Sequence, residues 1–305
     1  MRGLVIKSTG SSYIVRMDDG SDVECHIKGN FRIRGIRSTN PVAVGDFVEV
    51  QTLSDGTNWI VEIEERRNYI IRRSTNLSKE SHILASNIDQ VALIVTVNHP
   101  VTSTTFIDRF LATCEAYRVR AILIFNKIDL LTDEETAELE ALRALYEQLD
   151  YPTMEISAIS LRASEVLPLF AGKTTLLSGN SGVGKSTLLN ALFGKELTRT
   201  GKISDAHDKG MHTTTFSEMY FLEDGAIIDT PGIKGFGSID FGREEVSHYF
   251  REIFRTAKDC RFGNCTHTNE PGCAVQEAVV RGEIAVSRYE SYLSLLGDCE
   301  EKKYR

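Results

Sequence analysis

The stretch Gly179-Asn-Ser-Gly-Val-Gly-Lys-Ser186 decides the fold of this chain. The apolar run Thr174-Thr-Leu-Leu177 precedes it, and an amphipathic run continues from Lys185 to about Leu192. A glycine-rich turn between a strand and a helix is the context that a phosphate-binding loop requires. The pattern therefore predicts a parallel α/β sheet with a nucleotide phosphate at the amino end of the helix.

Each residue type in this glycine-rich loop has an expected task in holding a nucleotide. The glycines allow backbone N–H groups to turn toward the β-phosphate. Lys185 brings a positive charge to the β- and γ-phosphate oxygens, and Ser186 offers a hydroxyl to Mg²⁺. An accidental glycine-rich turn is the alternative, which the flanking strand and helix disfavour. The expected contacts are Ser178, Gly179, Asn180, Ser181, Gly182, Val183, Gly184, Lys185, Ser186 and Thr187.

A second motif, Asn126-Lys-Ile-Asp129, follows the apolar run Ala121–Phe125 and predicts which base is bound. The carboxylate of Asp129 can accept hydrogen bonds from guanine N1–H and from the exocyclic amine, a pair of donors that adenine lacks. We expect the stem of Lys127 to pack over the nucleotide. Alone, such a tetrapeptide can simply cap a helix, but beside a phosphate loop it indicates GTP or GDP.

The loop after the next apolar run completes the expected base site. Ser157 and Ala158 follow a strand predicted at Pro152–Ile156, and a backbone N–H in this loop can reach guanine O6. The expected contacts around the base are Asn126, Lys127, Ile128, Asp129, Ser157 and Ala158.

A third motif, Asp229-Thr-Pro-Gly232, follows the apolar run Ala226–Ile228 and predicts the part of the site that senses the γ-phosphate. We expect Asp229 to be linked to Mg²⁺ and Gly232 to contact the γ-phosphate. Mg²⁺ also requires a hydroxyl from the segment upstream, where the run Thr213–Thr215 lies. We favour Thr214, with Thr215 as the alternative; a β-prone threonine run without a metal is the other interpretation.

The residue after this motif is Ile233, where Ras-like enzymes carry the glutamine that orients the attacking water. An isoleucine can neither donate nor accept a hydrogen bond, so we expect slow intrinsic hydrolysis that depends on a partner or on another polar group. His212 is the candidate, and an ordinary surface histidine is the equal alternative. If His212→Ala leaves stimulated turnover unchanged, the assignment is wrong. The expected catalytic residues are Lys185, Thr214, Asp229, Gly232 and His212.

The order of the three motifs is permuted. A Ras-like GTPase has the phosphate loop first and Asn-Lys-x-Asp late, whereas here Asn126–Asp129 comes first and Asp229–Gly232 last. The segment after Gly232 therefore runs directly into the C-terminal region. We expect this wiring to couple γ-phosphate sensing to the orientation of that region.

The N-terminal and C-terminal regions differ from the central one in pattern. Short alternating runs separated by Asp-Gly and similar turns predict a small antiparallel barrel at 1–68. Its basic stretch Lys28–Arg37 suits RNA contact and a solvated loop equally well. We expect a linker at 69–82, the nucleotide-binding domain at 83–237 and a helical domain at 238–305, with one helix at about Arg243–Thr256.

A cysteine cluster distinguishes the C-terminal region. The pattern Cys260-x4-Cys265-x-His267-x5-Cys273 supplies three thiolates and an imidazole, the ligand set of a closed structural Zn²⁺ site. A redox pair or a coincidental cluster is the alternative. Nearby Arg251, Arg255, Lys258 and Arg261 suit phosphate contacts, or are merely solvated.

Composition limits the remaining possibilities. The net charge of −8 over 305 residues argues against wholesale nonspecific binding of polyanions, so any contact with nucleic acid is expected to be local. The N-terminal apolar run is too short for a signal peptide, and no stretch has the length of a membrane span. We expect a cytoplasmic monomer without membrane contact.

With these motifs assembled, the whole chain resembles the ribosome small-subunit-dependent GTPase A family of bacterial circularly permuted GTPases. The resemblance is carried by the phosphate loop, His212-Thr-Thr-Thr215, Asp229-Thr-Pro-Gly-Ile233 and Cys265-Thr-His-Thr-Asn-Glu-Pro-Gly-Cys-Ala-Val275. It implies an OB-fold barrel, a central GTPase and a zinc-binding domain. It also implies late maturation of the 30S subunit, with GTP hydrolysis stimulated by the ribosome.

The expected mechanism is a nucleotide-gated cycle. The GTP form docks the barrel and the zinc domain on rRNA of the small subunit, and hydrolysis releases the protein. The competing hypothesis is a GTP-dependent checkpoint scaffold with negligible turnover, in which Ile233 marks lost catalysis. A GTPase acting on another RNA or on the large subunit is a third, weaker interpretation.

Overall fold

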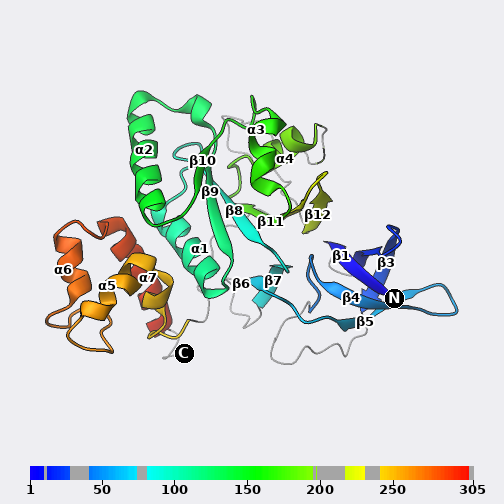
Figure 1. Ribbon diagram of the computed structural model, residues 1–305, viewed down its shortest axis with the longest axis horizontal. Coiled ribbons are helices and arrows are strands. Elements are labelled where there is room, and N and C mark those ends of the chain that lie inside the picture. The colour runs from blue at the N-terminus through cyan, green and yellow to red at the C-terminus, as the bar shows by residue number, and fades with distance from the viewer. Residues whose placement is uncertain are drawn as a thin grey trace.

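The structure, a computed structural model, describes residues 1–9, 12–27, 41–73, 81–194, 197, 217–230 and 241–301. Several predicted positions lie outside these residues: the basic stretch Lys28–Arg37, His212, Thr213–Thr215, Gly232 and Ile233. The barrel and the C-terminal helices lie on opposite sides of the central α/β domain (Figure 1).

The N-terminal region forms the predicted barrel. Its strands are β1 (Arg2–Ser8), β2 (Tyr13–Met17), β3 (Asp22–Ile27), β4 (Phe47–Thr52) and β5 (Asn58–Ile63). Strands β1, β2 and β3 form an antiparallel meander, β3 pairs with β5 in parallel, and β4 pairs with both β5 and β1. This closed five-stranded pairing is that of an OB-fold. Alternate residues such as Val5, Val15 and Ile60 fill its interior.

The central domain is the predicted parallel sheet. Its strands are β8 (Gln90–Val95), β9 (Arg120–Phe125), β10 (Thr153–Glu155), β11 (Thr174–Gly179), β12 (Glu218–Phe221) and β13 (Ala226–Asp229). They lie in the order β10-β9-β8-β11-β13-β12, and only β12 runs antiparallel to its neighbour. The carboxyl ends of the parallel strands therefore meet at one edge of the sheet, where ligands of such folds bind.

Helices cover both faces of this sheet. They are α1 (Thr104–Ala116), α2 (Asp133–Gln148), α3 (Ala163–Phe170) and α4 (Lys185–Phe193). On β8, Val91, Leu93 and Val95 share one apolar cluster with α1 and α2, whereas Ala92 and Ile94 share another with α3 and α4. From Val91 to Val95 the strand is apolar because both of its faces are buried.

The barrel and the central sheet are joined into one 11-stranded sheet, because β1 pairs antiparallel with β12. Ser8 N–H donates to the Ser217 carbonyl at 3.2 Å, and Lys7 forms an ion pair with Glu218 at 3.0 Å. The sequence pattern did not predict this junction, which pairs residues more than two hundred positions apart.

The range 69–82, expected to be a linker, begins and ends in paired strands. Strands β6 (Tyr69–Arg73) and β7 (Ser81–Ser86) form a two-stranded sheet, so we correct that expectation for both ends. The physical reason is burial: Ile70 and Ala85 are fully enclosed in the apolar cluster beneath α1. A linker has no such buried side chains.

A buried ion pair fastens the barrel to this two-stranded sheet. Arg66 lies 2.6 Å from the carboxylate of Asp46 and also donates to the Pro41 carbonyl. Arg66 donates to both carboxylate oxygens, and the Ser86 hydroxyl of β7 donates to Asp46 Oδ1 at 2.5 Å. At Gly45 a Cβ would lie 2.1 Å from the Ser86 carbonyl oxygen, so only glycine permits this approach.

The C-terminal region is helical, as predicted. It contains the 3₁₀ turns η2 (Val246–Tyr249) and η3 (Ala257–Asp259) and the helices α5 (Arg251–Thr256), α6 (Ala274–Val280) and α7 (Val286–Glu301). The expected single helix over Arg243–Thr256 is wrong, because Phe250 is extended, with φ −113° and ψ 103°. That break places the Phe250 ring edge-on to Tyr292 and beneath the Arg288 guanidinium, fully buried.

A buried charge network attaches this helical region to the central domain. Arg288 of α7 donates to Asp108 of α1 at 2.8 Å and to Glu252 of α5 at 2.7 Å. The Tyr146 hydroxyl of α2 donates to the same Asp108 oxygen at 2.9 Å. Arg288 and Asp108 are at most 1% exposed, so each charge depends on the others for solvation.

Candidate nucleotide and metal sites

The glycine-rich loop lies between β11 and α4, as the sequence predicts. Gly179 has φ 148°, and a Cβ there would lie 2.5 Å from the Ile94 carbonyl oxygen of β8. Gly184 has φ 99°, and a Cβ there would lie 2.3 Å from the Asn126 amide nitrogen. The two glycines therefore allow the loop to approach the neighbouring strand ends closely.

Lys185 is held inside this loop. Its Nζ donates to the Gly179 carbonyl at 2.7 Å and to the Asn180 carbonyl at 2.9 Å, and the side chain is only 8% exposed. Burial lowers the pKa of the amine to about 8, although the carboxylate of Asp229 partly opposes the shift. The lysine is thus a desolvated cation that a bound phosphate would stabilise.

We expect the affinity for GDP to fall as the pH rises above about 8. Without nucleotide the pKa of Lys185 is low, and bound phosphate raises it because phosphate favours the charged amine. Binding above this pH therefore takes up a proton, and log Kd is expected to rise by up to about one per pH unit. Calorimetry at about pH 9 in two buffers of different ionisation enthalpy measures the uptake. Lys185→Arg, which stays charged, should take up none.

Asn126 connects the three loops of the site. Its amide nitrogen donates to the Val183 carbonyl of the phosphate loop at 2.8 Å, and its oxygen accepts from Ala158 N–H at 3.0 Å. The side chain is 4% exposed. The structure thus places Asn126 and Ala158 in one hydrogen-bonded chain with the phosphate loop.

Asp129 and Ser157 are also brought together. The Ser157 hydroxyl donates to the Asp129 carboxylate at 2.5 Å, and Ile128 N–H donates to the Ile156 carbonyl at 3.4 Å. The carboxylate predicted to read the base is therefore held by a residue that follows β10. Its two oxygens still have acceptor capacity for the guanine donors.

Lys127 extends toward a segment that sequence reasoning missed, the loop Asn98–Pro100 after β8. Lys127 has φ 66°, and its Nζ donates to the His99 carbonyl. Pro100 lies 3.5 Å from the position of a Cβ on Gly182, so the loop also borders the phosphate loop. The available signal was topological, because a loop at the carboxyl end of a strand between β9 and β11 must lie beside both motifs.

Asp229 ends β13, next to β11, and is 1% exposed. Its carboxylate and the Ser186 hydroxyl are oxygen donors of the kind that Mg²⁺ takes. The Ser178 hydroxyl, fully buried at the start of the phosphate loop, has no hydrogen-bond partner in the described part of the chain. Thr214, Gly232 and His212 lie outside the described residues.

The predicted cysteine cluster is assembled in the C-terminal region. The ligand atoms of Cys260, Cys265, His267 and Cys273 all lie within 4.8 Å of one another. His267 Nδ1 is 3.6 Å from the sulfur of Cys260 and 3.5 Å from that of Cys273. Three sulfurs and one imidazole at these separations fit a tetrahedral Zn²⁺ ion.

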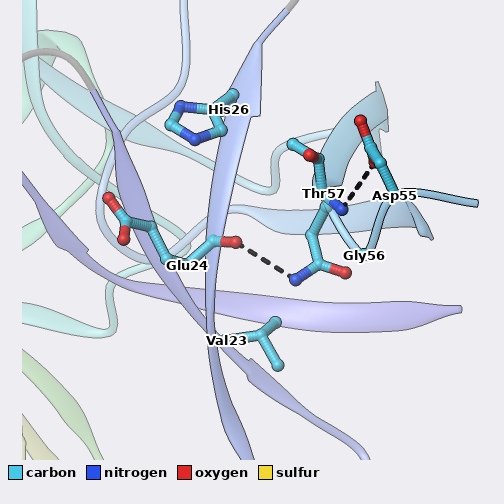
Figure 2. Close-up of a pocket in the computed structure, with 7 residues that line it drawn as sticks. Val23, Glu24, His26, Asp55, Gly56 and Thr57 are labelled. Carbon is cyan, nitrogen blue, oxygen red and sulfur yellow. Dashed lines mark hydrogen bonds between the residues drawn. The ribbon is translucent and has the colours of Figure 1, made fainter. Parts of the chain in front are cut away.

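A separate pocket lies on the barrel, between β3 and the turn before β5, as Figure 2 shows. Its lining residues are Val23, Glu24, His26, Asp55, Gly56, Thr57 and Asn58. Asn58 donates to the Glu24 carbonyl at 3.2 Å, and Thr57 N–H donates to Asp55 at 2.9 Å. With two carboxylates and neither lysine nor arginine in its lining, this pocket is unsuited to a triphosphate.

The fold and the nucleotide site together define a class of protein. The predicted base-reading loop follows β9, the glycine-rich loop follows β11 and Asp229 ends β13. These strands belong to the parallel run β9-β8-β11-β13, but the motifs come in permuted chain order. The protein is a circularly permuted GTPase.

Comparisons with known proteins give the family. Residues 63–239 match the family described as RsgA GTPase, and residues 2–60 match the RsgA N-terminal domain. The chain belongs to the RsgA family of GTPases. Proteins named small ribosomal subunit biogenesis GTPase RsgA from Phocaeicola vulgatus and Porphyromonas gingivalis are each 59% identical, over 100% of this chain and 99% of the relative.

Solved structures agree with this assignment. YjeQ from Thermotoga maritima matches with a TM-score of 0.74 and 31% identity, over 98% of both chains. YloQ, described as a circularly permuted GTPase, matches with a TM-score of 0.71 and 29% identity, over 100% of this chain and 96% of that one. The predicted permuted fold and enzyme class are confirmed.

Proposed function

We propose that this chain is a GTPase that binds the small ribosomal subunit and assists its late maturation, with hydrolysis stimulated by the subunit and driving release. The single observation that carries the proposal is the 59% identity over the full length to relatives named small ribosomal subunit biogenesis GTPases. The hydrogen-bonded chain from the phosphate loop through Asn126 to Ala158 supports guanine nucleotide binding.

The residues have distinct roles in this proposal. Asp129 reads the guanine edge, and Lys185 neutralises phosphate charge. Ser186 and Asp229 hold Mg²⁺, joined by Thr214, and bound Mg²⁺ supplies charge neutralisation at the phosphate oxygens. Gly232 senses the γ-phosphate, and His212 orients the attacking water. The roles of Thr214, Gly232 and His212 rest on the sequence alone.

The barrel and the zinc-binding region act as the two docking modules. The OB-fold topology supports single-stranded RNA as the ligand of the barrel, with the basic stretch Lys28–Arg37 as the contact. In the zinc-binding region, the rRNA phosphates would be contacted by Arg255, Lys258 and Arg261. The chain works as a monomer in the cytoplasm. Within the described residues, none of the helices has the length and apolar character to cross a bilayer.

Single-turnover GTP hydrolysis tests the proposal, with added 30S subunits, added 50S subunits or no subunit. We expect 30S subunits alone to raise the rate, by about 10³–10⁵ if they supply a missing transition-state element. Lys185→Ala controls for contaminating nucleotidases. Unchanged turnover together with GTP-dependent 30S binding would favour the checkpoint scaffold, and stimulation by 50S alone would favour a large-subunit role.

We propose one structural Zn²⁺ ion at the cysteine cluster, and we expect metal analysis to find about one zinc per chain. Cys273→Ser should lose most of the zinc and lower the melting temperature, because the Cys273 sulfur lies beside His267 and Cys273 caps the N-terminus of α6. The matched control is Cys299→Ser, which lies outside the cluster. Equal zinc content in the two variants would contradict the site.

A further inference from the structure

The loop that carries His267 has a backbone conformation that needs support. His267 has φ 57°, in the left-handed region that residues other than glycine seldom adopt. Its side chain is buried, and Nδ1 lies beside the sulfurs of Cys260 and Cys273. The direction of the imidazole therefore depends on a backbone conformation that costs free energy unless the surrounding contacts hold it.

One carboxylate, that of Glu270, holds this loop on both sides of His267. Its Oε1 accepts from Thr266 N–H at 2.7 Å and from the Thr266 hydroxyl at 2.6 Å. Its Oε2 accepts from Thr268 N–H at 2.9 Å and from Asn269 N–H at 3.1 Å. Because Thr266 precedes His267 and Thr268 follows it, a single side chain fixes both neighbours of the imidazole-bearing residue.

The carbonyl groups of the same loop are held by α7. The Tyr292 hydroxyl donates to the Thr266 carbonyl at 2.7 Å, and the Tyr289 hydroxyl donates to the His267 carbonyl at 2.5 Å. These tyrosines fix where the loop lies against the helix, whereas Glu270 fixes the shape of the loop from within. Glu270 is not one of the four clustered ligand residues, so its contacts act on the loop and not on a metal ion directly.

We propose that Glu270 is a positioning residue for the metal site, which holds His267 in the orientation that lets its imidazole bind Zn²⁺ together with the three cysteines. The inference rests on the zinc site of the proposed function. Groups that orient metal ligands contribute about 10- to 100-fold to metal affinity. Glutamine cannot replace this carboxylate, because its amide nitrogen is a donor and would face two donors of the loop.

Titration of the full, metal-free chain with Co²⁺ tests the proposal. The thiolate-to-cobalt absorption reports binding in every variant that keeps the cysteines, and competition with Zn²⁺ then gives the zinc affinity. We expect Glu270→Gln to weaken the binding of both metals by about 10- to 100-fold. Glu277→Gln is the matched control, because it makes the same chemical change at a carboxylate of α6 that is 64% exposed, and it should change neither affinity.

A double-mutant cycle with His267→Ala separates positioning of the imidazole from general support of the loop. His267→Ala removes one ligand and leaves the three cysteines. If Glu270 acts through His267, adding Glu270→Gln to this variant should weaken Co²⁺ binding by no more than about twofold.

Two results would overturn the inference. An equal loss of Co²⁺ affinity with and without His267 would mean that Glu270 supports the whole loop. Unchanged Co²⁺ affinity in Glu270→Gln alone would mean that the carboxylate does not orient the ligand. Failure of the unchanged chain to show thiolate-to-cobalt absorption would instead overturn the metal site itself.

Discussion

Arg288→Met is expected to lower the free energy of unfolding by about 3–5 kcal/mol. The guanidinium lies between Asp108 and Glu252, at 2.8 Å and 2.7 Å, and all three side chains are at least nine-tenths buried. Methionine fills much of the volume but leaves two carboxylates buried without a cation. Their desolvation is then uncompensated, which is the costly outcome for a buried ion network.

Urea denaturation followed by circular dichroism measures this loss. The control is Arg281→Met on the exposed end of α6, whose pairing with Glu283 at 2.8 Å is open to solvent and worth at most about 1 kcal/mol. A triple variant, Arg288→Met with Asp108→Asn and Glu252→Gln, should recover part of the loss because it buries no charge. Equal losses of unfolding free energy in Arg288→Met and Arg281→Met would show that the buried network stabilises the fold no more than an exposed ion pair does.

Asp129→Asn is expected to weaken GTP binding by about 10²–10³-fold. Two hydrogen bonds from guanine to a carboxylate are lost or reduced, each worth about 1.5–3 kcal/mol, and the asparagine amide now faces the exocyclic amine of guanine. Xanthine carries a carbonyl in place of that amine, so the same variant should bind xanthosine triphosphate better than the unchanged chain does.

Competition binding with the two triphosphates checks this exchange. Asp133→Asn, an exposed carboxylate at the start of α2, is the control and should leave both affinities unchanged. Weaker GTP binding without any gain for the xanthine nucleotide would mean that Asp129 supports the fold of the loop and does not read the base.

The elements with strong local patterns were predictable from the sequence. Strand β8 is apolar on both faces, and α4 follows a glycine-rich loop, so both could be predicted without knowledge of distant contacts. The grouping of Cys260, Cys265, His267 and Cys273 was predictable for the same reason, because the four residues are close in sequence.

Features that depend on distant contacts were not predictable. The break at Phe250 is stabilised by burial against Tyr292. This contact cannot be predicted from the local helical pattern, because the two residues are distant in sequence. The role of Asn98–Pro100 depends on strand order, which places β8 between β9 and β11. Asn126 was predicted as a nucleotide contact, but its ties to Val183 and Ala158 are visible only in three dimensions.

The predicted coupling between γ-phosphate sensing and the C-terminal region remains a prediction, because residues 231–240 lie outside the described chain. The Arg288 network adds a condition to it. Since α7 is bound to α1 through buried charges, a reorientation of the C-terminal helices must either break these contacts or carry α1 along. Identical positions of this region in GTP-analogue and GDP structures, on and off the ribosome, would refute the coupling.

The pairing of β1 with β12 has a consequence for how the barrel can be studied. In a truncated chain that lacks the barrel, β12 would be an unpaired edge strand of the sheet. The Ser217 carbonyl would lose its hydrogen bond from Ser8, and Phe221, already 39% exposed, would lie on the open edge strand. Open edges recruit strands from other molecules, so such a fragment is expected to self-associate. Loss of ribosome binding in that fragment would therefore reflect aggregation as much as the missing RNA contacts, and point changes within the barrel are the sounder probe.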